Sequence, residues 1–120
     1  SASARLEGFL LGNLRFTYQR WSYQPRINEL VEAIARERTD VVQEHLRVKQ
    51  ELVVKLIEDG NGNGEFSVTD PKQTAEAILV ASTVFGVPLF MHMHPYDKFE
   101  SMARNVADLI LRGLKARPAT

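Results

Sequence analysis

Cysteine is absent from this sequence of 120 residues, which excludes disulfides, thiol nucleophiles and thiolate metal sites. A chain without cysteine suits a reducing compartment, and we expect a cytoplasmic location. Net charge is absent too, because 15 basic residues balance 15 acidic ones. No long-range positive field therefore attracts the phosphates of a nucleic acid, and this chain alone should bind DNA poorly.

Long hydrophobic runs are also missing. The longest strongly apolar stretch, residues 77–91, is interrupted by Ser82, Gly86 and Pro88 and is too short to cross a bilayer. The first residues show no basic segment followed by an apolar run, so we expect neither a secretory signal nor a membrane partner. The sequence opens on Ser1 without an initiator methionine, which we interpret as a cut within a longer protein. Residues 1–120 have the length of one domain.

What is present is helical spacing. Apolar residues make up 44% of the chain and recur at intervals of three and four, whereas no alternating strand pattern extends beyond a few residues. The sequence therefore predicts an all-α fold. We expect a central helix over 5–18, a turn before Pro25, two helices joined by a bend near Asp40, a helix over 71–93 and a last helix that ends at Arg117-Pro118.

Several residues mark where these helices begin and end. Gly60 is expected just past a helix end, and Asp70 is expected to cap the helix that starts at Pro71. His94 should cap the last helix in the same way before Pro95. Pro88 should kink the helix over 71–93 near Val84 and Phe85. That helix is apolar on two sides. One side can pack within the chain, and the other must be covered by a further partner.

Residues 59–70 also match the calcium loop of an EF-hand, which stays open as an alternative function. The oxygen ligands would come from Asp59, Asn61, Asn63, Glu65, Ser67 and Asp70. Against this alternative, the last position is an aspartate where a bidentate glutamate is usual, and no second loop exists to pair with the first. The stretch 91–94 is excluded as a metal site, because helical residues two apart point about 200° from each other.

No catalytic constellation is evident. The sequence holds no phosphate loop, no Gly-x-Ser-x-Gly segment and no nucleophile beside an evident base. We therefore predict a protein that is not an enzyme and that needs no cofactor.

The second half of the chain carries a series of short motifs. They are Leu56-Ile57-Glu58-Asp59-Gly60, Gly64-Glu65-Phe66, Asp70-Pro71, Phe85-Gly86-Val87-Pro88 and Leu109-Ile110-Leu111-Arg112-Gly113-Leu114. In this order and spacing they resemble the C-terminal domain of tetracycline repressor (TetR) type regulators. The resemblance implies a regulatory domain of a transcriptional repressor with about five or six helices. Operator DNA would be bound by helix-turn-helix heads in an N-terminal part that this chain lacks.

The resemblance further implies a homodimer and an effector pocket. In the family, the last two long helices of each subunit form a four-helix bundle with those of the partner; the contacts expected here are Val80, Val84, Val87, Met91, Val106, Ile110 and Leu114. The effector would be a small hydrophobic or aromatic molecule. The aromatic pocket candidates are Phe9, Phe16, Trp21, Tyr23 and Phe85. Leu89 is added because it lies on the same helix side as Phe85, and His45 because it is a polar residue beside the apolar helical stripe from Ile34 to Leu56. Arg38 also stands beside that stripe and needs a partner.

Overall fold

The structure, a computed structural model, describes residues 1–115. Five α-helices and two 3-10 helices follow one another: α1 (Ala2–Tyr23), α2 (Ile27–Glu37), α3 (Thr39–Gly62), α4 (Pro71–Ala81), η1 (Thr83–Gly86), η2 (Pro88–Met93) and α5 (Tyr96–Leu114). These residues contain no strand, only an isolated bridge between Phe66 and Lys115. The all-α class is thus confirmed. The expected helix end at Arg117-Pro118 lies outside the described residues.

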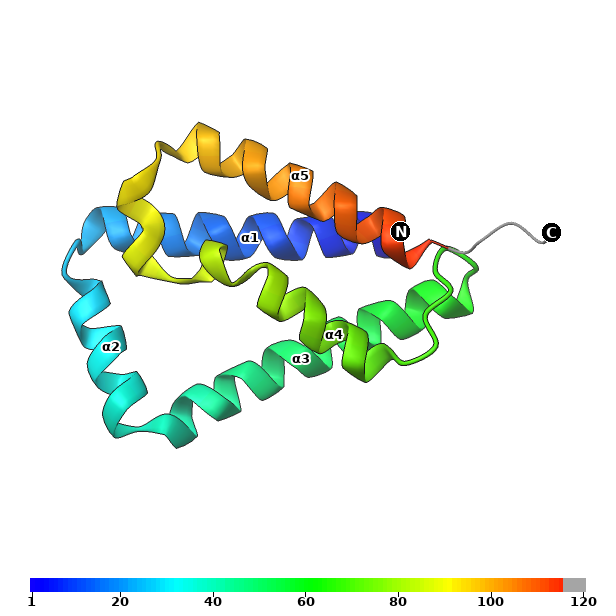
Figure 1. The fold of residues 1–120 in the computed structure, drawn as a ribbon, viewed down its shortest axis with the longest axis horizontal. Coiled ribbons are helices and arrows are strands. Elements are labelled where there is room, and N and C mark those ends of the chain that lie inside the picture. Colours follow the sequence, from blue (N-terminus) through cyan, green and yellow to red (C-terminus); the bar gives the residue numbers. More distant parts are fainter. Residues whose placement is uncertain (116–120) are drawn as a thin grey trace.

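Helix α1 is the central element, as predicted. It packs along α5 and also contacts α3, η1 and η2, while α4 packs on α3. Figure 1 shows α2 joining the far ends of α1 and α3, so that these three helices form three sides of an open frame. The molecule measures 52 × 33 × 18 Å along its principal axes. Within residues 1–115, no helix combines the length and the apolar character needed to cross a membrane.

Two hydrophobic cores lie along α1, one toward each end. The first joins Leu6 and Leu10 to Ile57 of α3 and Ile78 of α4. The second joins Leu14 to buried side chains of the segment 85–103: Phe85, Met91, Phe99 and Ala103. The spacing 6, 10, 14 places these leucines on one face of α1, which explains why a single helix serves both cores.

The α3–α4 connection differs in detail from the prediction. Gly60 lies inside α3, which continues to Gly62, so the predicted helix end at Gly60 is wrong. The ring of Phe66 packs where a Cβ atom of residue 60 would stand. The residue with a positive φ is Gly64, at 86°. Gly60 is therefore needed for a close approach of a side chain and not for a left-handed backbone.

Asp70 caps α4 as predicted, since its Oδ1 accepts a hydrogen bond from the Gln73 amide at 3.1 Å and Pro71 follows at the first helical position. The predicted continuous, kinked helix over 71–93 is wrong, because α4 ends at Ala81. The Ser82 hydroxyl donates back to the Ile78 carbonyl at 2.8 Å, and Pro88 imposes an extended backbone on Val87. Two 3-10 helices replace the remainder of the expected helix.

His94 does not cap the last helix, so that prediction is wrong. Helix α5 begins after Pro95, and no side chain caps its first turn. The backbone of His94 is extended, and its ring meets the ring of Phe99 edge-on at 5.2 Å between centroids. The helix end expected before Trp21 is wrong, because α1 continues to Tyr23 and the turn is formed by Pro25 and Arg26. The break between α2 and α3 lies at Arg38, next to the bend expected near Asp40. Arg38 itself is exposed and pairs with Asp40 at 3.0 Å.

Candidate ligand pocket

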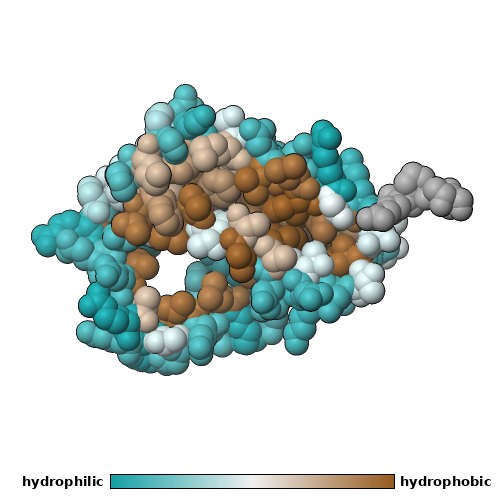
Figure 2. Space-filling model, viewed as in Figure 1, coloured by the Kyte–Doolittle hydropathy of each residue, from teal (hydrophilic) through white to brown (hydrophobic). Residues whose placement is uncertain are grey.

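A cavity of about 410 Å³ lies inside the frame formed by α1, α2 and α3 and is bounded by the two 3-10 helices. Figure 2 shows an opening bordered by hydrophobic surface in this part of the molecule. Residues from all five elements line it: Phe16, Thr17, Arg20, Ile27, Val31, Ile34, Val41, Val42, His45, Leu46, Lys49, Gly86 and Pro88. Its volume falls in the usual range of ligand pockets, about 300–1,000 Å³.

The walls from α2 and α3 are apolar and incompletely covered by protein. Ile27, Val31 and Ile34 follow at intervals of four and three, which places them on one face of α2. Ile27 is buried, but 39% of Val31 and 49% of Leu46 on α3 stay exposed. Apolar surface gathered around a cavity, without a protein partner, is typical of a binding site.

The α1 edge combines an aromatic ring with a cation. The Phe16 side chain is 61% exposed. The guanidinium of Arg20 lies over its ring, 5.4 Å from the centroid. Arg20 and Phe16 stand four residues apart and therefore share a helix face. Beside them, the Thr17 hydroxyl donates to the Asn13 carbonyl at 2.8 Å, so Thr17 already has its partner.

Asn13 of α1 lines a neighbouring groove and lies close to two residues of the cavity lining, Lys49 on α3 and Gly86 on η1. Its Oδ1 accepts a hydrogen bond from Lys49 Nζ on α3 at 3.1 Å. On its other side, a Cβ atom added to Gly86 would lie 2.9 Å from Asn13 Nδ2, so the glycine lets η1 lie close to this amide without displacing it. Asn13 thus bonds to Lys49 and lies beside η1.

His45 and Lys49 stand one turn apart on α3 and both line the cavity. Burial lowers the pKa of His45, and the charge of Lys49 lowers it further. Burial also lowers the pKa of Lys49, which is half-buried. His45 is exposed and Lys49 is half-buried, so both shifts reflect partial removal of a cation from water with no opposite charge among the stated causes.

The sequence-based pocket candidates are distributed unevenly. Phe16 and His45 line the cavity. Phe9 lines a neighbouring shallow groove, and Phe85 is buried in the second core.

Trp21 packs against Tyr18 at the edge of the second core, with ring centroids 5.5 Å apart. Tyr23 and Leu89 are 86% and 50% exposed and do not line the cavity. The residues that sequence reasoning missed are polar, namely Asn13, Arg20 and Lys49. The spacing of Lys49 four residues after His45 was the available signal.

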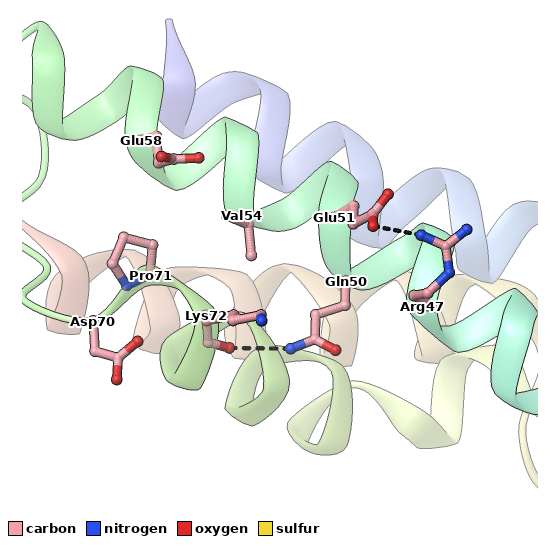
Figure 3. Close-up of a pocket in the computed structure, with 8 residues that line it drawn as sticks. All are labelled: Arg47, Gln50, Glu51, Val54, Glu58, Asp70, Pro71 and Lys72. Atoms are coloured by element: carbon pink, nitrogen blue, oxygen red, sulfur yellow. Dashed lines mark hydrogen bonds and ion pairs between the residues drawn. The ribbon is translucent and has the colours of Figure 1, made fainter.

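A second, larger groove of about 680 Å³ lies between α3 and the start of α4 (Figure 3). Charges of both signs line it, from Arg47, Glu51, Glu58, Asp70 and Lys72 among others. Two interactions join groups shown there: Arg47 pairs with Glu51, and Gln50 Nε2 donates to the Lys72 carbonyl at 3.3 Å. The smaller, apolar cavity is therefore the better candidate for a small-molecule site.

The predicted dimer contacts fall into two groups. Met91 is fully buried and Leu114 is 6% exposed, so both pack inside the protomer. Val80 and Val84 are 71% and 40% exposed, whereas Val87, Val106 and Ile110 are half-buried. The structure adds Leu109 on α5, which is 71% exposed.

The segment 59–70 does not form an EF-hand loop. Asp59 and Asn61 lie within α3. The Asp59 carboxylate accepts from Arg5 at 3.0 Å, and the Asn61 amide exchanges two hydrogen bonds, each of 2.9 Å, with the Val68 backbone. Asp70 caps α4. Among residues 1–115, no group of three or more histidine, aspartate or glutamate side chains is placed to hold a metal ion.

The remaining candidate calcium ligands also have other roles. Glu65 accepts hydrogen bonds from the backbone amides of Ala2 at 2.8 Å and Ser3 at 3.3 Å, and from Asn63 Nδ2 at 2.6 Å. These bonds, the one from Ala2 foremost, lower the pKa of Glu65 to about 2. The Ser67 amide donates to the Leu114 carbonyl at 2.9 Å. The structure thus gives no support to the calcium-binding alternative.

Comparison with known proteins gives one finding. A family model described as "Tetracyclin repressor-like, C-terminal domain" matches residues 2–107. That match extends from the start of α1 into α5 and includes every residue that lines the apolar cavity. Neither the curated proteins nor the solved structures give a match.

Proposed function

The chain belongs to the tetracyclin repressor-like C-terminal domain family, and we propose that it is the effector-binding and dimerising domain of a transcriptional repressor. Domains of this family generally dimerise and bind small-molecule effectors, and they are generally not enzymes. The observation that carries the proposal is the cavity of about 410 Å³ among α1, α2 and α3. We propose that the effector binds there, against Phe16 and His45.

The cavity suits an effector because occupancy would bury apolar surface that the protein leaves uncovered. Val31, Val41 and Leu46 are 39%, 44% and 49% exposed around it. Burial of apolar area contributes about 25 cal/mol per Å², and these residues offer such area on two helices, α2 and α3. Helix α1 contributes both to the cavity and to the packing of α5. A ligand that moves α1 would therefore also move α5.

The effector site is tested with the neutral dye Nile red, whose fluorescence rises on transfer from water to an apolar site. We expect saturable binding of about one dye per protomer. Leu46→Trp fills the cavity with an indole and should abolish saturation. Leu52→Trp is the matched control, because Leu52 is 51% exposed on the same helix and lies outside the cavity lining. Equal binding by both variants would place the dye elsewhere and contradict the proposed site.

The dimer is proposed to form through the second apolar faces of α4 and α5. Leu109 is the most exposed large apolar residue of α5, and Val80 is the most exposed large apolar residue of α4. Three further positions, Val106, Ile110 and Val84, extend these faces. Because Met91 and Leu114 are buried within the protomer, they are not part of the proposed contact.

Light scattering after size exclusion tests the dimer at several protein concentrations. The wild type should have twice the mass of one chain, and the double variant V80D/L109D should have the mass of one. Leu30→Asp is the control, since Leu30 is 55% exposed on α2, away from both faces. A wild type that stays monomeric throughout, or a double variant that stays dimeric, would refute this interface.

Repression is proposed to depend on helix-turn-helix heads carried by another part of the regulator. Two such heads must sit about 34–36 Å apart to enter successive major grooves, so the geometry of the dimer sets operator affinity. A coupling of about 1–3 kcal/mol between effector and operator is typical of such systems. In the full regulator, Leu46→Trp should therefore abolish release of operator DNA by the effector while dimerisation persists.

A further inference from the structure

The lining of the apolar cavity has charge of only one sign. Arg20, His45 and Lys49 face it from α1 and α3, and no aspartate or glutamate is among the lining residues. Within residues 1–115, neither Arg20 nor Lys49 takes part in an ion pair. The larger groove beside α4 differs, because acidic side chains there stand beside Arg47 and Lys72. The uncompensated positive charge is thus a local property of the cavity.

Lys49 is the least exposed of these groups, because Arg20 and His45 are both exposed while Lys49 is half-buried. Its ammonium has three donors, and the bond to Asn13 Oδ1 at 3.1 Å uses one of them. Within the described residues, no other hydrogen bond of this ammonium accompanies that one. The group is half-buried, and burial holds the pKa of Lys49 below its ordinary value. A half-buried cation of this kind becomes more favourable when an anion reaches it.

The volume of the cavity gives the size of the ligand body that it can hold; the cavity is open to solvent (Figure 2). At about 30 Å³ per water in the liquid, a cavity of about 410 Å³ holds the equivalent of roughly fourteen water molecules. A body of about ten to fourteen non-hydrogen atoms therefore fits. The apolar walls of the cavity include Ile27, Val31 and Leu46, which offer no hydrogen-bonding side chain.

We propose that the cavity selects a monoanionic carboxylate with an apolar body of about ten carbon atoms, whose carboxylate contacts Lys49, with Arg20 and His45 close by. This inference rests on the proposed effector function and adds the chemical class of the effector. The carboxylate supplies the negative charge that the lining lacks, and the body covers the exposed valines and leucine. A neutral ligand of the same shape leaves Lys49 uncompensated.

Three probes of equal chain length test the charge: decanoate, 1-decanol and decyltrimethylammonium, each titrated calorimetrically below its aggregation concentration. We expect decanoate to bind at least about tenfold more tightly than 1-decanol, which is the usual effect of a hydrogen bond to a charged group. The cationic probe should bind most weakly. Lys49→Gln should reduce decanoate affinity about tenfold and leave 1-decanol affinity unchanged, which also shows that the variant is folded.

Lys55→Gln is the matched control, because Lys55 is an exposed lysine on the same helix outside the cavity lining. It should bind decanoate as the wild type does. If decanoate and 1-decanol bind equally, or if Lys49→Gln weakens both alike, the selection for an anion is refuted while the effector site stands. If none of the three probes binds and Nile red also fails to saturate, the proposed function itself is refuted.

Discussion

Gly60 offers a sharp test of how the α3–α4 connection is packed. A Cβ atom at this position would overlap the ring of Phe66. That ring is 3% exposed and belongs to the first core. It cannot swing aside, because the Phe66 amide donates to the Gly60 carbonyl at 3.0 Å and the next amide donates to Leu114. Substitution by alanine must therefore displace a side chain that is fixed on both sides.

The expected magnitude follows from two opposing effects. Alanine stabilises a helix by about 0.5–1 kcal/mol relative to glycine. Overpacking a filled core costs about 1–3 kcal/mol. For Gly60→Ala the second effect should win, with a net loss of about 1–2 kcal/mol. Gly62→Ala is the matched control, since residue 62 ends the same helix and has no heavy atom within 4 Å of a built Cβ. It should be neutral or stabilising.

Thermal unfolding followed by circular dichroism measures both variants. At roughly 4 °C per kcal/mol for a domain of this size, Gly60→Ala should lower Tm by about 4–8 °C, and Gly62→Ala should not lower it. In the background of Phe66→Leu, the penalty for Gly60→Ala should shrink, which gives a coupling energy between positions 60 and 66. Equal Tm values for the two alanine variants, or the same penalty with and without the ring, would refute the proposed overlap.

Two further predictions concern the ends of helices. Asp70→Ala should lower stability by about 1 kcal/mol, because the Gln73 amide loses its acceptor, while Thr69→Ala should be neutral; urea unfolding compares the two, and equal midpoints would contradict the capping role. Glu65 has a pKa of about 2 against an ordinary value of 4.5, so its stabilising contribution is complete above about pH 4.5 and is lost as pH falls toward 2. Unfolding measured across this range should show a smaller acid-dependent loss for Glu65→Gln than for the wild type or Glu58→Gln; parallel curves would refute it.

Much of the fold could be predicted from local signals in the sequence. Helical spacing identified the helices, and Asp70-Pro71 located the start of α4 because capping depends on neighbouring residues alone. The interpretation of Gly60 failed for the opposite reason. Glycine is needed at position 60 because the ring of Phe66 packs against it, and the sequence does not reveal which aromatic ring will contact a given helix residue. The helix expected over 71–93 ends at Ala81, where the Ser82 and Thr83 hydroxyls donate to the Ile78 and Leu79 carbonyls, and the apolar spacing continues past this end without marking it.

The pocket was harder to predict than the fold, since residue type alone does not decide burial. Aromatic character selected Phe85 and Trp21, yet Phe85 lies in the second core and Trp21 packs at its edge. Phe16 has the same character and is 61% exposed beside the cavity. What distinguishes Phe16 is its place on the side of α1 opposite Leu14, because residues two apart on a helix point in widely different directions.

The same comparison explains how α1 would connect the proposed effector site to the proposed dimer face. One face of α1, at Leu6, Leu10 and Leu14, is fully buried and ties both cores together. The other face, at Phe16 and Arg20, borders the cavity, where few protein contacts oppose a change. Because few protein contacts oppose movement at the open apolar wall, a ligand would draw α2 and the first half of α3 toward α1. The packed cores would then transmit a displacement of α1 to the helices packed against it. Any difference in affinity between the open and closed arrangements then biases α5, and with it the proposed dimer face.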